Sequence, residues 1–374
     1  MNNNITILGL FDHDGLPSIR SGTSPGDQLR GPYCAELLGQ YANLVTVRMP
    51  SSRVHRKVKD VVEHRTGVPA DLAIRGLASA RRADAVLAIL EDKSVLPAAL
   101  KRRGLTAYAK TRLAAVSCWW GEELKTGSAA RREEIARTVA GVDRIFVFSR
   151  NQVELFAQIG AGGKVAPINF GVEHTKYVPD SSVEQRFQVF SGGLDAGRDF
   201  ETLVEAARLL PHVDFHLVSH LHRFQQMDLP KNVTTSGPTD GQTHRQNLLA
   251  AQLVVTPTHD LAYPTGQSVL LEAMSSGKAC AVTETEAMRE YIDEGVSNFG
   301  MPLHDPQGVA AVIERVLTRP AELLEVGRRA RAAVEDRYTF DQMWKSIAEQ
   351  LERDRVENSP GARRRSPGAG RNAA

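Results

Sequence analysis

Short apolar runs alternate with amphipathic segments through the first half of the chain. The apolar runs predict five buried strands, at Ile5–Leu10, Leu44–Val47, Ala85–Leu90, Leu113–Val116 and Arg144–Phe148. The segments between them predict helices at Tyr33–Gln40, Leu72–Arg82, Arg131–Ala140 and Gln152–Ile159. This alternation is typical of a mainly parallel sheet that is covered by helices on both faces.

The same pattern restarts in the second half of the chain. Strands are predicted at Phe187–Phe190, Val213–Val218, Leu253–Thr256 and Ala279–Thr283, and helices at Phe200–Leu210, His244–Ala251 and Val269–Ser276. Three closing helices are expected at Gln307–Leu317, Ala321–Val334 and Asp341–Leu351. The stretch Asn169–Arg186 is rich in turn-forming residues, so we expect an inter-domain linker there. The two halves therefore predict two α/β domains, which suits a chain of 374 residues.

Composition narrows the class of protein further. The 46 basic and 44 acidic residues leave a formal charge of only +2, which argues against a nucleic-acid binder. Cys34, Cys118 and Cys280 lie far apart, so we expect neither a disulfide framework nor a zinc site. We find no signal-peptide architecture and no apolar run near the roughly 20 residues that span a bilayer. We therefore expect a cytoplasmic protein, with peripheral membrane contact left open.

A glycine-rich turn, Ser191–Arg198, joins a predicted strand to a helix that begins near Asp199. Gly192 and Gly193 permit a close approach of the backbone to a ligand. The helix start offers free N–H groups to an anion, and Arg198 adds a guanidinium beside them. The turn therefore predicts a diphosphate cradle. The alternative is an ordinary strand–turn–helix connection with Asp199 as the N-cap.

A second small, polar loop, Pro264–Ser268, opens the helix that contains Glu272. It follows the predicted strand Leu253–Thr256, and ligands of open α/β sheets collect at the carboxyl ends of strands. We therefore expect it near the first turn. The Glu272 carboxylate is favoured by the helix dipole and has the chemistry to accept hydrogen bonds from a ribose. The alternative is a surface glutamate that only serves the helix end.

Taken together, these segments resemble the retaining glycosyltransferases of family 4. The resemblance covers about residues 140–350 and is weaker before them. The segments that carry it are Phe170-Gly-Val-Glu, Gly192-Gly-Leu-Asp-Ala-Gly-Arg, Leu271-Glu-Ala-Met-Ser-Ser-Gly, Met288-Arg-Glu-Tyr-Ile-Asp-Glu-Gly and Arg337-Tyr-Thr-Phe-Asp-Gln-Met-Trp.

The resemblance implies the GT-B fold, with two Rossmann-like domains whose parallel sheets face each other across a cleft. It implies an acceptor-binding domain over residues 1–170 and a nucleotide-sugar-binding domain over residues 171–340. Residues 341–355 would form a final helix that packs back on the N-terminal domain. Residues 356–374 are expected to be a disordered tail, because their composition cannot bury apolar area.

The resemblance also implies roles for single residues. Arg198 would neutralise the donor diphosphate and Glu272 would contact the nucleotide ribose, as the two catalytic residues. The remaining donor-site residues would be Gly192, Gly193, Thr265, Gly266, Gln267 and Ser268. The chain departs from the family's pattern at two positions. Gly193 stands where the family usually has an arginine, and Pro264 stands where it has its first glutamate.

The acceptor side is predicted from the N-terminal half. A long polar loop follows the first strand and contains Asp14 and Gly15, and Trp119 and Trp120 follow the strand at Leu113–Val116. Aromatic faces stack on sugars, so both tryptophans are acceptor-side candidates. Alternatively, Asp14 and Gly15 lie in a solvated loop with no ligand role, and the tryptophans pack in the core.

We therefore expect a glycosyltransferase of the hexosyltransferase type that acts with retention of configuration. Its acceptor would be a small molecule or glycan from secondary-metabolite or envelope-glycan biosynthesis. We expect a UDP-linked donor first and a GDP-linked donor next, with no obligatory cofactor and no metal. The competing hypotheses are a sugar-nucleotide epimerase of the same fold and a catalytically degenerate nucleotide-binding scaffold. The oligomeric state is not predicted.

Overall fold

The structure is a computed structural model that describes residues 4–13, 16, 31–105 and 107–357. Contacts divide the chain into two compact units. The first unit comprises Met1–Ser117, Ala136–Phe146 and Trp344–Ala374, and the second comprises Cys118–Ile135 and Val147–Met343. The division differs from the predicted boundary at residue 170 because earlier residues bond within the second unit. Tyr291 Oη donates to Phe148 O, and Ala262 N donates to Glu122.

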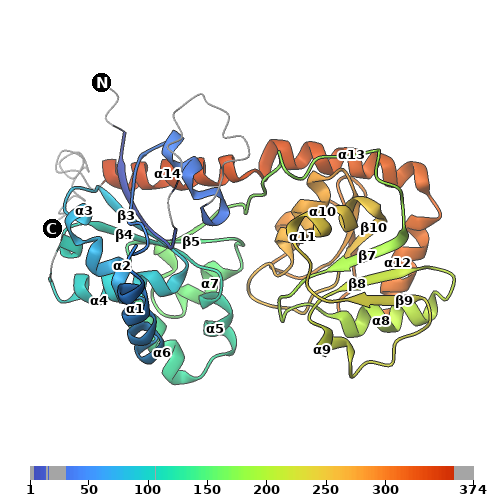
Figure 1. Ribbon diagram of the computed structural model, residues 1–374, viewed down its shortest axis with the longest axis horizontal. Helices are drawn as coiled ribbons and strands as arrows, with labels where there is room; N and C mark the ends of the chain where they lie inside the picture. Colours follow the sequence, from blue (N-terminus) through green and yellow to red (C-terminus); the bar gives the residue numbers. More distant parts are fainter. Residues whose placement is uncertain (1–3, 14–15, 17–30, 106, 358–374) are drawn as a thin grey trace, which may run out of the picture. The chain divides into compact units, whose positions relative to one another are not determined.

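The first half of the chain forms a parallel six-stranded sheet in the order β2-β1-β3-β4-β5-β6 (Figure 1). In that order the strands are Asn43–Thr46, Thr6–Leu10, Ala85–Ile89, Arg112–Val116, Arg144–Val147 and Val165–Pro167. The division between the units runs through β5, so β6 counts with the second unit. The central strand β3 is buried along its whole length, which explains its uninterrupted apolar run.

Helices connect these strands. The α-helices are α1 (Arg53–Thr66), α2 (Ala70–Arg75), α3 (Leu77–Ala80), α4 (Val95–Arg102), α5 (Trp120–Thr126), α6 (Ala129–Val139) and α7 (Gln152–Ala157). The 3₁₀ helices are η2 (Pro32–Gln40), η3 (Glu91–Ser94), η4 (Ala107–Ala109) and η5 (Gly162–Lys164). The single helix expected over Leu72–Arg82 is thus divided into α2 and α3 at Gly76. An added Cβ at Gly76 would lie 3.0 Å from Leu72 O, so a larger residue would require its neighbours to shift by a few tenths of an ångström.

The second half forms another parallel six-stranded sheet in the order β12-β11-β10-β7-β8-β9. In that order the strands are Phe299–Met301, Ala279–Thr283, Ala251–Thr256, Phe187–Gly192, Phe215–Val218 and Val233–Ser236. The helices are α8 (Phe200–Leu209), α9 (Leu221–Phe224), α10 (Gly241–Ala250), α11 (Gln267–Ser275), η6 (Arg289–Tyr291), α12 (Pro306–Leu317), α13 (Pro320–Arg337) and α14 (Phe340–Glu357). Side chains of α8 and α12 pack with the sheet into one buried cluster that includes Phe200, Phe215 and Ile313.

Four helices in the second half of the chain begin in two different ways. Three of them begin after an aspartate that accepts a hydrogen bond from the third helical residue: Asp199 before α8, Asp240 before α10 and Asp305 before α12. Helix α11 instead begins after Gly266, which has a φ of 83° and which no described side chain caps. Its first N–H groups therefore lack the carboxylate that the other three helices use.

The last helix, α14, carries a buried ion pair within the first unit. Asp354 is 1% exposed and receives Arg144 Nη2 at 2.5 Å and Arg144 Nε at 2.9 Å. The Trp344 indole donates to Tyr33 O at 2.7 Å. These contacts hold α14 to β5 and η2 of that unit. The helix extends to Glu357, and the predicted tail lies outside the described residues from residue 358 onward.

Candidate functional site

The Arg198 side chain lies fully buried between two glycines at the carboxyl edge of the second sheet. It is 1% exposed. A Cβ added to Gly266 would lie 2.5 Å from Arg198 Nη1, and one added to Gly193 would collide with Arg198 Nε. The guanidinium thus occupies the space that side chains at these two positions would need. The structure brings together these three predicted residues, and it gives a packing reason for glycine at two of them.

Two nitrogens of this guanidinium have no partner in the described part of the chain. Nε and Nη1 of Arg198 are buried, and no described residue accepts a hydrogen bond from them. Burial lowers the pKa of Arg198 to about 10, although the nearby charges of Asp195 and Glu272 partly offset that effect. An unpaired buried cation is costly. The arrangement therefore suits an anionic ligand that supplies both charge and hydrogen-bond acceptors.

The helix N-terminus that can receive such an anion is that of α11, not that of α8. At α8, Asp199 Oδ1 accepts from Thr202 N at 2.9 Å and Oδ2 accepts from Thr202 Oγ1 at 2.7 Å. Asp199 is therefore the N-cap of α8. The α11 N-terminus, at Gly266, lies against the Arg198 guanidinium, and no described side chain caps it. Gln267 N donates to Pro264 O at 3.2 Å, so the N–H groups that α11 offers to an anion at its positive end are those of Ser268 and Val269.

Asp195 fixes the shape of both loops, and the sequence did not single it out. Its Oδ1 accepts from Gly197 N at 2.6 Å, from Thr265 Oγ1 at 2.9 Å and from Tyr263 Oη at 3.1 Å. Arg223 Nη1 donates to Asp195 O at 2.8 Å. The turn after β7 and the loop after β10 are thus joined through one carboxylate, and the predicted residue Thr265 takes part through its hydroxyl.

Glu272 lies in the second turn of α11 and already has a partner. Its Oε2 lies 2.9 Å from His244 Nε2 of α10, and both side chains are about four-fifths buried. Burial raises the pKa of Tyr177, and the adjacent Glu272 carboxylate raises it further. His244 therefore orients this glutamate. Sequence reasoning missed His244, because its helix is distant in sequence and carries no motif.

The other predicted donor-site residues differ in exposure. Gly192 ends β7 and is buried, and Gln267 is partly exposed with a buried, unpartnered Oε1 among the described residues. Ser268 is exposed on the first turn of α11. Two further hydroxyls, Thr256 Oγ1 and Thr258 Oγ1, are buried without a partner in the described part of the chain. These threonines end β10 or follow it, at the same edge as Arg198.

Three residues beside Arg198 form a group that could hold a metal ion. The ligand atoms of Asp199, His259 and His304 lie within 4.8 Å of one another. His304 Nδ1 lies 2.8 Å from Asp199 Oδ2, which is the distance of a direct hydrogen bond. Asp199 also caps α8 through Thr202, so its carboxylate is shared between the helix cap and the histidines. The expectation that no metal takes part stays a prediction.

The acceptor-side candidates have different positions. Asp14 and Gly15 lie outside the described residues. Trp120 is 3% exposed and its ring meets Phe156 edge-on at 6.5 Å, so it packs in the core as the alternative for it proposed. Trp119 is 48% exposed. A hollow of about 780 Å³ lined by Leu77 and five neighbouring residues holds none of the predicted site residues.

The protein thus has two α/β domains with parallel sheets. A buried arginine at a helix N-terminus of the second one forms a candidate site for an anionic ligand. Residues 186–319, about a third of the chain, match the model of the family described as glycosyl transferases group 1. A search of the curated proteins found no match.

Solved structures match nearly the whole chain. HepE from Anabaena, in complex with UDP and glucose, has a TM-score of 0.64 at 16% identity, covering 93% of this chain and 100% of that one. Sucrose-phosphate synthase from Thermosynechococcus elongatus has a TM-score of 0.64 at 16% identity, covering 84% of both chains. A glycosyltransferase from Rickettsia africae has a TM-score of 0.59 at 12% identity, covering 96% of this chain and 100% of that one.

The predicted fold class is confirmed: the chain has the two-domain Rossmann-like GT-B fold. The family model and the fold together support a GT-B glycosyltransferase. The family match covers the second sheet from β7 to α12, which is the part that contains Arg198, Gly266 and Glu272.

Proposed function

We propose that this chain is a glycosyltransferase that moves a hexosyl group from a UDP-linked donor to an acceptor hydroxyl, with retention of anomeric configuration. The observation that carries this proposal is the buried Arg198 guanidinium, with two unpartnered nitrogens among the described residues. A diphosphate supplies two charges and several acceptor oxygens, which is what this position lacks. Inorganic anions supply the same chemistry, so the nucleotide part rests on the family model and the motifs.

Arg198 would act on the charge that develops during transfer. As the glycosidic bond to the diphosphate breaks, negative charge grows on the leaving phosphate oxygens. The guanidinium and the N–H groups after Gly266 are already fixed beside that position, so they stabilise this charge without reorganising. The buried surroundings strengthen the interaction relative to water. Retention belongs to the proposal because the motifs resemble those of family 4, whose members retain configuration.

Glu272 would hold the nucleotide ribose. Its Oε2 is bonded to His244, which leaves Oε1 to accept from a ribose hydroxyl. His244 would thus position the carboxylate and not touch the donor. Gly192, Gly193, Thr265, Gln267 and Ser268 complete the proposed donor pocket.

The donor base is assigned from the solved structures of similar fold. HepE is described with UDP and with UDP-glucose. We therefore propose UDP as the nucleotide of the sugar donor for this chain, with GDP as the next candidate. We propose Trp119, which is 48% exposed, as an acceptor-side residue, and a small-molecule or glycan acceptor in the cytoplasm.

Calorimetric titration with UDP, GDP, dTDP and ADP tests the donor site and names the base. The matched variants are Arg198→Ala and Arg328→Ala, the second being an exposed arginine of α13. We expect UDP to bind wild type and Arg328→Ala equally and Arg198→Ala far more weakly. Binding that is unchanged in Arg198→Ala would remove the assignment of the diphosphate to this residue.

Turnover separates the proposed reaction from its competitors. The protein is incubated with UDP-glucose and followed by proton NMR, with water or a panel of acceptor alcohols. We expect release of UDP together with a glucose product whose first anomer is α. A changed sugar still joined to UDP would identify an epimerase, and binding with no product in any mixture would identify a non-catalytic scaffold.

A further inference from the structure

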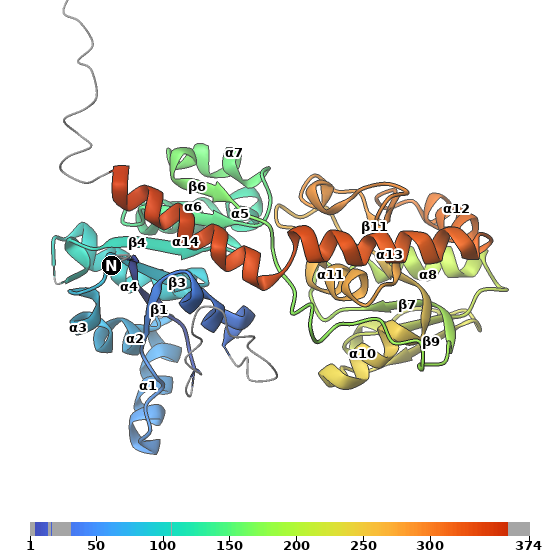
Figure 2. The same ribbon diagram turned by 90° about the horizontal axis from the view of Figure 1, so that it is seen from above.

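Helix α1 is packed on the first unit through polar side chains, and its apolar side chains face outward. None of its residues is buried. Four of its valines, Val54, Val58, Val61 and Val62, are between 44% and 74% exposed. An amphipathic helix of a globular domain normally directs its apolar face to the core. In Figure 2, α1 projects from the body of the first unit.

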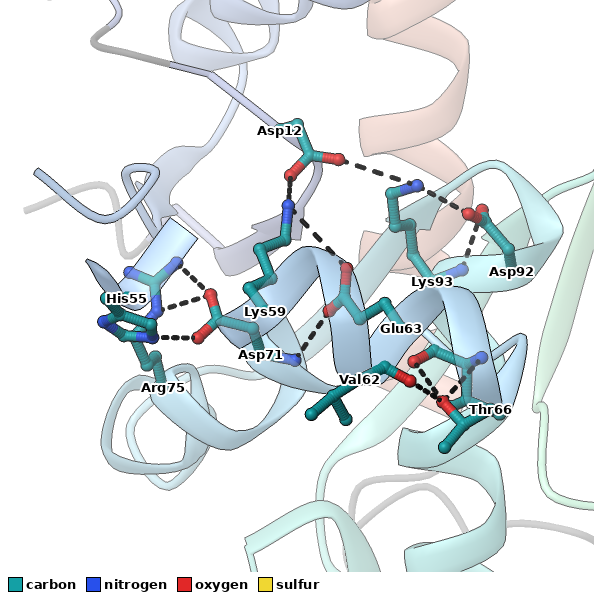
Figure 3. Close-up of polar contacts among 11 residues, drawn as sticks. Asp12, His55, Lys59, Val62, Glu63, Thr66, Asp71, Arg75, Asp92 and Lys93 are labelled. Carbon is teal, nitrogen blue, oxygen red and sulfur yellow. Dashed lines mark hydrogen bonds and ion pairs between the residues drawn. The ribbon is translucent and has the colours of Figure 1, made fainter. Parts of the chain in front are cut away.

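Ionic contacts hold the polar face of α1 in place (Figure 3). Lys59 Nζ lies 3.2 Å from Asp12 Oδ1, and Glu63 Oε1 accepts from Asp71 N at 3.0 Å. His55 Nε2 lies 2.6 Å from Asp71 Oδ1. Lys59 and Glu63 are the two residues of this helix that are partly buried. The helix is therefore anchored by its charged residues, in an orientation that leaves the valines exposed.

The exposed side of α1 combines apolar and basic residues. At about 100° per residue, the four valines fall within an arc of about 100°. Arg65 lies within this arc and Lys57 lies about 40° outside it, whereas Arg53 lies about 80° outside it, close to Asp60. Asp60 is the one acidic residue of the helix on this outward side, since Glu63 is used in the anchoring contacts. The outward side thus carries a net positive charge beside its apolar strip.

We infer that α1 docks the protein on an anionic lipid surface, with its valines among the acyl chains and Lys57 and Arg65 against the headgroup phosphates. Charge complementarity favours this occupant over a second copy of the chain, because two α1 helices face to face would bring like charges together. A helix that lies in a membrane interface likewise combines an exposed apolar strip with lysine and arginine side chains. Among the described helices, none is long and apolar enough to cross a membrane.

Vesicle flotation of the full chain tests this inference. The vesicles contain phosphatidylcholine alone or with about one third phosphatidylglycerol, in about 0.05 M NaCl, where surface charges are weakly screened. The variants are Val58→Glu/Val62→Glu and Lys57→Glu/Arg65→Glu. The matched control is Leu209→Glu/Leu324→Glu, which places two glutamates at exposed leucines of α8 and α13. Because the changed residues are exposed, thermal unfolding should show that all variants remain folded.

We expect wild type and the control to float with the anionic vesicles and not with neutral ones. Each α1 variant should lose at least about tenfold in affinity, since a single surface cation contributes about fivefold. Raising NaCl to about 0.5 M should release the wild type. Equal binding to neutral vesicles, equal loss in the control, or no binding by the wild type would overturn the inference. A wild-type dimer that becomes a monomer in the valine variant would assign this face to self-association. Flotation measures binding to vesicles and not sugar transfer, so a negative result does not bear on the proposed function.

Discussion

Replacing Arg198 with methionine should separate ligand binding from stability. Methionine is nearly as long and unbranched, so it fits between Gly193 and Gly266 without a new Cβ clash. It removes the charge and the two nitrogens that have no partner among the described residues. The pKa of about 10 lies well below the ordinary value for arginine. At about 1.4 kcal/mol per pKa unit, holding this charge costs the ligand-free protein about 3 kcal/mol.

Two opposite effects are therefore expected from Arg198→Met. The free energy of unfolding without ligand should stay the same or rise by up to about 3 kcal/mol, because a buried charge is replaced by an apolar group of similar volume. UDP should bind at least about 100-fold more weakly, because hydrogen bonds to charged groups contribute about 1.5–3 kcal/mol each. Urea denaturation measures the first quantity and calorimetry the second.

The control for this experiment is Arg328→Met on the exposed surface of α13, which should change neither quantity. A large loss of stability in Arg198→Met would mean that Arg198 is a satisfied structural cation. UDP binding at wild-type strength would mean that the diphosphate lies elsewhere. Either result would refute the reasoning from the unpartnered guanidinium.

Three further predictions concern the support of the site and of the fold. Gly266→Ala should lower the free energy of unfolding by about 1–3 kcal/mol in urea denaturation, because the position has a φ of 83° and a Cβ there meets the buried guanidinium. His244→Ala should weaken UDP binding about tenfold in calorimetry with little change in stability, because Glu272 loses the partner that orients it; unchanged binding would show that the carboxylate needs no such partner. Asp354→Asn should lower the free energy of unfolding by about 3 kcal/mol, because Arg144 loses its ionic partner. Burial alone would raise the pKa of Asp354, but hydrogen bonds from Arg144 and a neighbouring amide hold it below its usual range. Its contribution should therefore be complete above about pH 4 and be lost as the pH falls below that value, which unfolding curves in acid would show.

The sequence predicted the buried strands well and the exposed elements poorly. The apolar run Ala85–Leu90 corresponds to β3, and Ala279–Thr283 to β11, because strands inside a parallel sheet are apolar along their length. The edge strands β9 and β12 were missed, since they are short and β9 is largely polar. Helix α1 was missed because it packs through charged residues, so it has no apolar face toward the core.

The sequence also indicated which residues form the site but not how they are arranged. Glycine turns and a nearby arginine pointed to an anion, because these residue types suit phosphate in any fold. The sequence did not show that the Arg198 guanidinium is buried against the N-terminus of α11 and not against that of α8. This placement depends on how two loops about 70 residues apart pack together. Asp195 and His244 act through contacts of this long-range kind, which no local pattern reveals.

A crystal structure of the protein with UDP would test whether Arg198 and the N-terminus of α11 bind the donor diphosphate. We expect a phosphate oxygen within hydrogen-bond distance of Nε or Nη1 of Arg198, with the other phosphate oxygens at the first N–H groups of α11. A well-ordered UDP that leaves both nitrogens without a partner, or that lies away from Gly266, would contradict it.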